Sequence, residues 1–143
     1  MIKKLPFLLV PFFIGYMAFG QHVNPNANDC IQNFILNAKT QPGENQRVDD
    51  IVISWNFSQN TNTQNLKLTF EVQPLNACWK ELEGTNRLEA KTFKILNFSE
   101  NSIGNQKLIY NDLICKCLKW RAIIIDSTTN CEVKTDWKFT SFL

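Results

Sequence analysis

The chain has 143 residues, of which 44% are hydrophobic, and it carries 15 Lys and Arg against 13 Asp and Glu. Loss of residues 1–20, which hold two of the lysines, would leave 13 charges of each sign. A neutral chain with scattered charges lacks the basic patch that nucleic acids require and the polybasic segment that anionic membranes attract, which leaves an unidentified protein or glycan as the predicted partner.

Residues 1–20 have the pattern of a signal peptide. Two lysines at 3–4 precede an apolar run over 5–19, and small residues stand at Ala18 and Gly20. The alternative is a membrane anchor, but the run is short for a bilayer span and two prolines interrupt it. We therefore expect cleavage after Gly20, no stable membrane span afterwards, and a secreted, cell-surface or periplasmic protein.

The first part of the mature chain is the least regular. Residues 21–29 are predicted to form a flexible polar leader, followed by one domain over residues 30–143. The apolar residues of 30–38 suit either a helix or an edge strand, and the strand is favoured because the rest of the chain is β. Residues 41–45 are predicted to form a loop.

Alternating apolar residues predict two clear strands in the middle of the chain. The first covers 51–57 and places Trp55 in the core; the second covers 66–72, places Leu68 and Phe70 there, and is expected to end at Pro74. The intervening residues 58–65 are polar. A shorter strand is predicted over 77–82 and another, with a bulge, over 88–98; residues 97–105 are expected to be a loop.

The C-terminal pattern predicts a hairpin. One strand places Trp120 and its aliphatic neighbours on one face, residues 126–130 turn the chain, and the next strand places Val133, Trp137 and Phe139 on one face. Six or seven short strands without a βαβ rhythm predict an all-β fold: an antiparallel two-sheet sandwich.

From about residue 28 onward the chain resembles a fibronectin type III domain. The likeness rests on Ile-Val-Ile-Ser-Trp-Asn at 51–56, on Asp-Leu at 112–113 followed by Leu-Lys-Trp-Arg-Ala at 118–122, and on the closing hairpin. The family usually has a Tyr where Leu118 stands here. The resemblance implies an immunoglobulin-like β-sandwich of six or seven strands that serves as an interaction or spacer module, and it does not imply catalysis.

The five cysteines of an exported chain should form two disulfides, which leaves one cysteine without a partner in the same chain. On the sandwich that the resemblance implies, Cys30 and Cys131 lie at one pole, and Cys78 can reach either Cys115 or Cys117 at the other. We expect those two disulfides. The remaining thiol leaves open a disulfide-linked dimer or a thiol-dependent redox accessory that uses Cys115 or Cys117.

The residues needed for other chemistry are scarce. His22 is the only histidine, so neither a Ser-His-Asp nor a Cys-His arrangement is available, and no metal site, catalytic residue or cofactor is predicted. An enzyme is therefore not expected.

The predicted function is that of a disulfide-stabilised interaction or adhesion-type module. Trp79, beside Cys78, is a candidate hot-spot residue, while Asn60, Asn62 and Thr128 lie in loops that should share one pole. A structural subunit that assembles through a strand edge is a further alternative.

Overall fold

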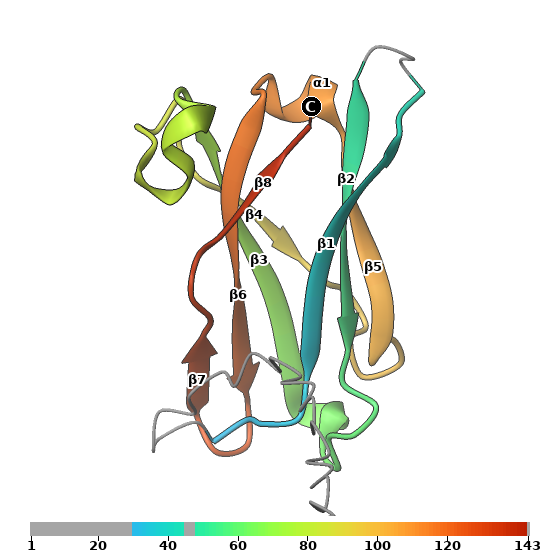
Figure 1. The fold of residues 1–143 in the computed structure, drawn as a ribbon. Coiled ribbons are helices and arrows are strands. Elements are labelled where there is room, and N and C mark those ends of the chain that lie inside the picture. The colour runs from blue at the N-terminus through green and yellow to red at the C-terminus, as the bar shows by residue number, and fades with distance from the viewer. Residues whose placement is uncertain (1–29, 45–47, 143) are drawn as a thin grey trace, which may run out of the picture.

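The computed structural model describes residues 30–44 and 48–142, so the predicted signal peptide and leader lie outside the described residues. Two antiparallel sheets face each other (Figure 1). The first has the order β1-β2-β5 and consists of β1 (Ile35–Pro42), β2 (Asp49–Asn56) and β5 (Ile103–Leu108). The second consists of β4 (Lys91–Lys94), β3 (Leu66–Leu75), β6 (Cys117–Asp126), β7 (Cys131–Lys134) and β8 (Lys138–Ser141), and both β7 and β8 pair with β6. The predicted all-β class with two antiparallel sheets is confirmed.

Three short helical segments complete the described part of the fold: η1 (Thr63–Asn65), η2 (Cys78–Glu83) and α1 (Tyr110–Leu113). Within residues 30–44 and 48–142, no helix is both long and apolar enough to cross a membrane.

The core between the sheets is built on three aromatic side chains in contact. The ring of Phe70 lies 5.7 Å from that of Trp55 and 6.0 Å from that of Trp120, between ring centroids, so the two sheets meet through these rings. All three side chains are at least 95% buried, as is Leu68. Burial of large apolar side chains is the main favourable term in folding, so this cluster anchors the sandwich.

The first strand begins and ends later than predicted. Of the two alternatives predicted for residues 30–38, the strand is confirmed and the helix is wrong. The strand β1, however, runs from Ile35 to Pro42 and so includes two residues that were expected to be in a loop. β1 pairs only with β2, and an edge strand tolerates Pro42 at its end because no second ladder needs its N–H.

Pro74 does not end the second clear strand, because β3 continues to Leu75. The carbonyl of Pro74 accepts a hydrogen bond from the Arg87 N–H at 2.9 Å, so the backbone polar groups of Pro74 point away from β6. β4 pairs with β3 only as far as Val72. The missing N–H of the proline therefore removes no ladder hydrogen bond at this position.

The strand predicted over 77–82 is wrong: these residues form most of the 3₁₀ segment η2. They follow β3 at a level where no neighbouring strand continues, so an extended segment there would have no partner. The strand predicted over 88–98 is reduced to β4, since Leu88 and Leu96 at its ends are exposed.

The loop predicted over 97–105 is also partly wrong, because β5 begins at Ile103. Its sequence, Ile-Gly-Asn-Gln-Lys-Leu, has apolar residues only at its ends, so no alternation is visible. The strand is defined instead by its ladder with β2, in which Trp55 pairs with Gly104 and Ile51 with Leu108.

The final strand is broken by a one-residue register shift, which moves Trp137 out of the core. Ile123 pairs with Lys134 on β7, but Trp120 pairs with Lys138 on β8, so one extra residue lies between the two ladders. Thr135 occupies this bulge and bonds Ala122 twice, each at 3.0 Å: through its own N–H and by accepting the Ala122 N–H on its hydroxyl. A one-residue slip reverses which side chains face inward.

Candidate binding surface

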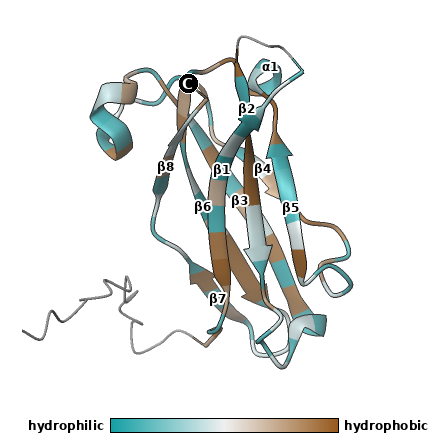
Figure 2. Cartoon of the chain, turned by 45° about the vertical axis from the view of Figure 1, so that its right-hand side comes forward, coloured by the Kyte–Doolittle hydropathy of each residue, from teal (hydrophilic) through white to brown (hydrophobic). Residues whose placement is uncertain are grey.

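The connection between β3 and β4, residues 76–90, projects from the body of the sandwich as the Trp79 loop (Figures 1 and 2). Backbone hydrogen bonds close its base: the Asn76 N–H donates to the Thr85 carbonyl at 2.9 Å, and the Arg87 N–H donates to the Pro74 carbonyl. Leu75 also forms an isolated bridge with Asn86. The loop is thus closed at its neck like a hairpin.

A disulfide joins this loop to the neighbouring strand. Cys78, the first residue of η2, is bonded to Cys117, the first residue of β6, with 5.6 Å between their Cα atoms. This is one of the two pairings predicted for Cys78. The second disulfide, Cys30–Cys131, is also formed as predicted, at the opposite pole, with 6.2 Å between Cα atoms.

Inside the loop the backbone makes a tight double turn. The Lys80 N–H donates to the Ala77 carbonyl and the Gly84 N–H to the Glu81 carbonyl, each at 3.1 Å. A Cβ atom at Gly84 would lie 2.8 Å from the Ala77 oxygen, so only glycine fits there. Glu81 has φ 47° and ψ −122°, a region that non-glycine residues rarely adopt and that costs about 1–3 kcal/mol.

The loop presents unusual apolar surface. Trp79, Leu82 and Leu88 lie in it and are three of the eight exposed large hydrophobic residues in the described chain. Trp79 is 81% exposed, the most of any of them. Its indole N–H has no hydrogen-bond partner within the described ranges, and the Lys80 ammonium lies over its ring, 5.0 Å from the ring centroid. A fixed loop thus holds a large apolar surface in water.

The two loops that hold the other predicted binding residues, one between β2 and β3 and one between β6 and β7, lie at the opposite pole (Figure 1). The Ser127 N–H donates to the Asn65 carbonyl at 3.0 Å, so the two predicted loops do meet there. The Asn60 amide, however, donates to the Gln32 carbonyl at 3.1 Å and accepts the Asn62 N–H at 3.2 Å. Because this amide is engaged in holding the loops together, the pole has fewer free side-chain groups for a ligand than the pattern predicts.

Thr128 serves the turn at that pole. Its N–H donates to the Asp126 carboxylate at 2.8 Å, and this hydrogen bond, with others in the turn, holds the pKa of Asp126 below its ordinary value. The structure does not bring Trp79 together with Asn60, Asn62 or Thr128.

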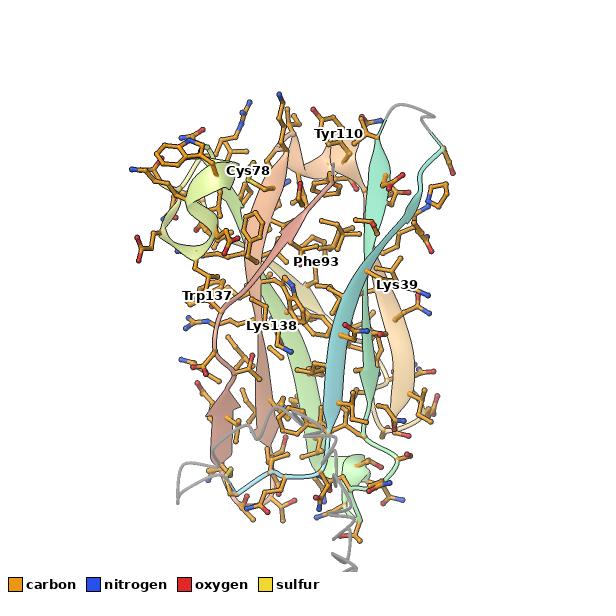
Figure 3. All side chains as sticks on the ribbon, in the orientation of Figure 1. Lys39, Cys78, Phe93, Tyr110, Trp137 and Lys138 are labelled. Atoms are coloured by element: carbon orange, nitrogen blue, oxygen red, sulfur yellow. A yellow bond between two sulfur atoms is a disulfide. The ribbon has the colours of Figure 1, made fainter. Side chains whose placement is uncertain are left out.

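Trp137, predicted to lie in the core, lies instead on the outer face of the five-stranded sheet (Figure 3). The Arg121 guanidinium stacks 4.4 Å from its ring centroid, and the Lys119 ammonium lies 5.4 Å away. Arg121 also forms an ion pair with Glu71 at 2.6 Å. The bulge that reorients Trp137 leaves no mark in the sequence pattern, which is why sequence reasoning missed this patch.

The unpaired cysteine is Cys115, and it is 1% exposed. Burial raises the pKa of its thiol, because a thiolate is poorly solvated away from water. A buried thiol with a raised pKa has little thiolate at neutral pH, which disfavours nucleophilic chemistry at this residue. No group of three or more His, Cys, Asp and Glu side chains in the described ranges is arranged to hold a metal ion.

Comparison with protein-family models, curated proteins and solved structures found no match to this chain.

Proposed function

We propose that the chain is an exported, non-catalytic interaction module that binds a protein partner through the Trp79 loop. The observation that supports this most is the 81% exposure of Trp79 on a loop fixed by a disulfide and a hydrogen-bonded neck. Exposed apolar surface rimmed by polar residues often marks an interaction site, and tryptophan is enriched among the residues that dominate binding energy.

The size of the available surface supports a hot-spot role. A buried aromatic residue removes about 150–250 Å² from water, and four-fifths of the Trp79 surface is accessible. Covering about 160 Å² at about 25 cal/mol/Å² contributes about 4 kcal/mol before the costs of association. Half of that value already meets the threshold of about 2 kcal/mol for a hot spot.

The surroundings of Trp79 favour a protein over a glycan. Leu82 and Leu88 add apolar surface, and charges of both signs at Lys80, Glu81 and Glu83 surround it. An apolar centre with a charged rim is the usual composition of a protein–protein interface. A glycan partner, the other class that the sequence allows, would need polar groups arranged beside the ring.

The sandwich and its disulfides support the remaining parts of the proposal. If β1, β2 and β5 are lettered A, B and E, and β4, β3 and β6 are lettered C′, C and F with β7 and β8 together as G, the sheets are A-B-E and C′-C-F-G. This arrangement agrees with an immunoglobulin-like sandwich of the fibronectin type III kind. Two disulfides suit an oxidising compartment, as the predicted signal peptide requires. The burial of Cys115 weighs against the thiol-dependent alternative and against a dimer linked through that residue.

The test is a binding screen on arrays of cell-surface and periplasmic proteins and of glycans, with wild type, Trp79→Ala and Ile35→Ala in parallel. Ile35 is a matched control because it is also an exposed apolar residue, 67% exposed, but on β1. We expect at least one protein that binds wild type and Ile35→Ala but not Trp79→Ala. Binding partners that are indifferent to Trp79→Ala would contradict the proposal, and binding only to glycans would reassign the partner class.

A further inference from the structure

Edge strands present unpaired backbone groups, and most edges of this sandwich are protected. β4, at one edge of the five-stranded sheet, is short and carries a lysine at each end. The other edge of that sheet is formed by β7 and β8 and is interrupted by the bulge between them. On β1, the Leu36 carbonyl accepts a hydrogen bond from the Lys138 side chain at 3.1 Å, and Pro42 ends the strand. Lysine, proline, bulges and short strands are the usual protections against edge pairing.

β5 has almost none of these protections. It forms the outer edge of the three-stranded sheet (Figures 1 and 2), spans six residues, and contains neither proline nor bulge. Its one charged residue, Lys107, is already paired with Asp50 at 2.7 Å. The charge that would normally repel an incoming strand is therefore neutralised within the chain.

The direction of the unpaired backbone groups follows from the ladder with β2. The Phe57 N–H donates to the Ser102 carbonyl at 2.8 Å, so even-numbered residues turn their N–H and C=O toward β2 and odd-numbered residues turn theirs outward. The Gln106 side chain agrees with this phase, because its amide donates to the outward carbonyl of Lys107 at 2.9 Å. Asn105 is the central residue of the open edge.

A groove lies beside this edge, between the two sheets. Its volume is about 430 Å³, and Gly104 forms part of its wall. A Cβ atom at Gly104 would lie 2.5 Å from the Trp55 ring, so this position of the edge has no side chain. The other lining residues include Lys94, Ile95, Leu96, Asn101 and Gln106. Leu96 is 80% exposed, and Ile103, at the start of β5, is 61% exposed.

We propose that β5 pairs antiparallel with β5 of a second copy of this chain, in a register centred on Asn105. A two-fold axis then passes between the two Asn105 residues, and two three-stranded sheets become one of six strands. The same register places Gln106 opposite Gly104 and Ile103 opposite Lys107. The Gln106 amide leaves the Lys107 carbonyl and lies over Gly104 of the second copy, where no side chain opposes it.

This pairing is self-complementary in charge and shape. No two like charges stand directly opposite, because Lys107 faces Ile103, and the aliphatic stem of the lysine covers part of the exposed isoleucine. A contact of one six-residue strand is smaller than the roughly 1,200 Å² typical of stable complexes, so the dimer is weak and forms at high protein concentration.

The first experiment is sedimentation velocity on the purified, disulfide-bonded protein over a concentration series from about 10 µM to about 1 mM, a range chosen for weak association. We expect the weight-average mass to rise with concentration toward twice the monomer mass. Cys115→Ser should behave as wild type, because the association is not covalent. A mass that stays at the monomer value throughout the series would overturn the proposal.

The second experiment tests the register with a charge swap. Asn105→Lys and Asn105→Asp each place like charges opposite one another at the axis, and Asn105 is exposed, so both variants should fold. Each variant alone should lose the association, and an equimolar mixture of the two should recover it. Thr40→Lys, on the edge strand β1, is the matched control and should associate as wild type. Undiminished association of Asn105→Lys, or no recovery in the mixture, would refute pairing through β5.

Discussion

The disulfide at the neck of the Trp79 loop should contribute a large share of the stability of the domain. Cys78 and Cys117 are 39 residues apart, and cross-linking a loop of that length removes denatured-chain entropy worth about 4 kcal/mol. Small domains have total stabilities of about 5–15 kcal/mol. We therefore expect Cys78→Ala/Cys117→Ala to fold with a strongly reduced free energy of unfolding.

The assay is guanidinium unfolding at equilibrium, with thermal unfolding as a second measure. All proteins should carry Cys115→Ser, so that no alternative pairing forms. The double variant should lose about 4 kcal/mol, which corresponds to a fall in melting temperature on the order of 10–20 °C for a domain of this size. Removal of Cys30 and Cys131, which are 101 residues apart, should cost about 4.7 kcal/mol in the same model.

A loss below about 1 kcal/mol for Cys78→Ala/Cys117→Ala would refute the reasoning, since it would mean that the cross-link barely restricts the denatured chain. If removal of the Cys78–Cys117 disulfide cost much more stability than removal of Cys30–Cys131, native contacts of the Trp79 loop, rather than loop length, would determine the cost.

Three further predictions concern single residues. Gly104→Ala should destabilise the fold by about 1–3 kcal/mol in denaturant unfolding, because its Cβ would meet the Trp55 ring; an unchanged midpoint would contradict this close approach. Asp126→Asn should lower stability at neutral pH only. The Thr128 N–H lowers the pKa of Asp126 in the folded state, so this carboxylate stabilises the fold at pH values above its pKa in the unfolded state. That stabilisation is lost as pH falls through the pKa of Asp126 in the folded state. A difference between wild type and variant that stays constant down to about pH 2 would argue against that hydrogen bond. Cys115 should react with a thiol reagent far more slowly in the native than in the unfolded protein, and equal rates would contradict its burial.

The strands that could be predicted from sequence are those buried on one face. Trp55, Leu68, Phe70 and Trp120 alternate with polar residues because one side of each strand packs in the core, and period two records that arrangement directly. The pairing of Cys30 with Cys131 followed from the poles of such a sandwich, and the structure contains it.

The rest depends on contacts between distant residues. β5 has only Ile103 and Leu108 as apolar residues, and its strand conformation comes from the ladder with β2. The bulge at Thr135 is held by two hydrogen bonds to Ala122, which no local pattern records, and it turns Trp137 outward. Apolar and polar residues keep alternating in the sequence through the bulge, whereas the backbone pairing with β6 shifts by one residue there.

The Trp79 loop was predicted in part. The place of Trp79 beside Cys78 made it a candidate binding residue, but its exposure was not known from the sequence, and a strand was expected where the 3₁₀ segment η2 lies. Its shape is set by the close approach at Gly84 and by the disulfide to β6, which local propensity does not encode.

The affinity of Trp79→Ala for a protein that binds wild type tests the central claim most directly. By titration calorimetry against that partner, we expect Trp79→Ala to bind at least about 30-fold more weakly, the equivalent of about 2 kcal/mol, while Ile35→Ala binds as wild type. Trp79→Phe should retain part of the affinity, because it keeps an aromatic surface. Equal affinities of wild type and Trp79→Ala, with both proteins folded, would contradict the assignment of the Trp79 loop as the binding surface.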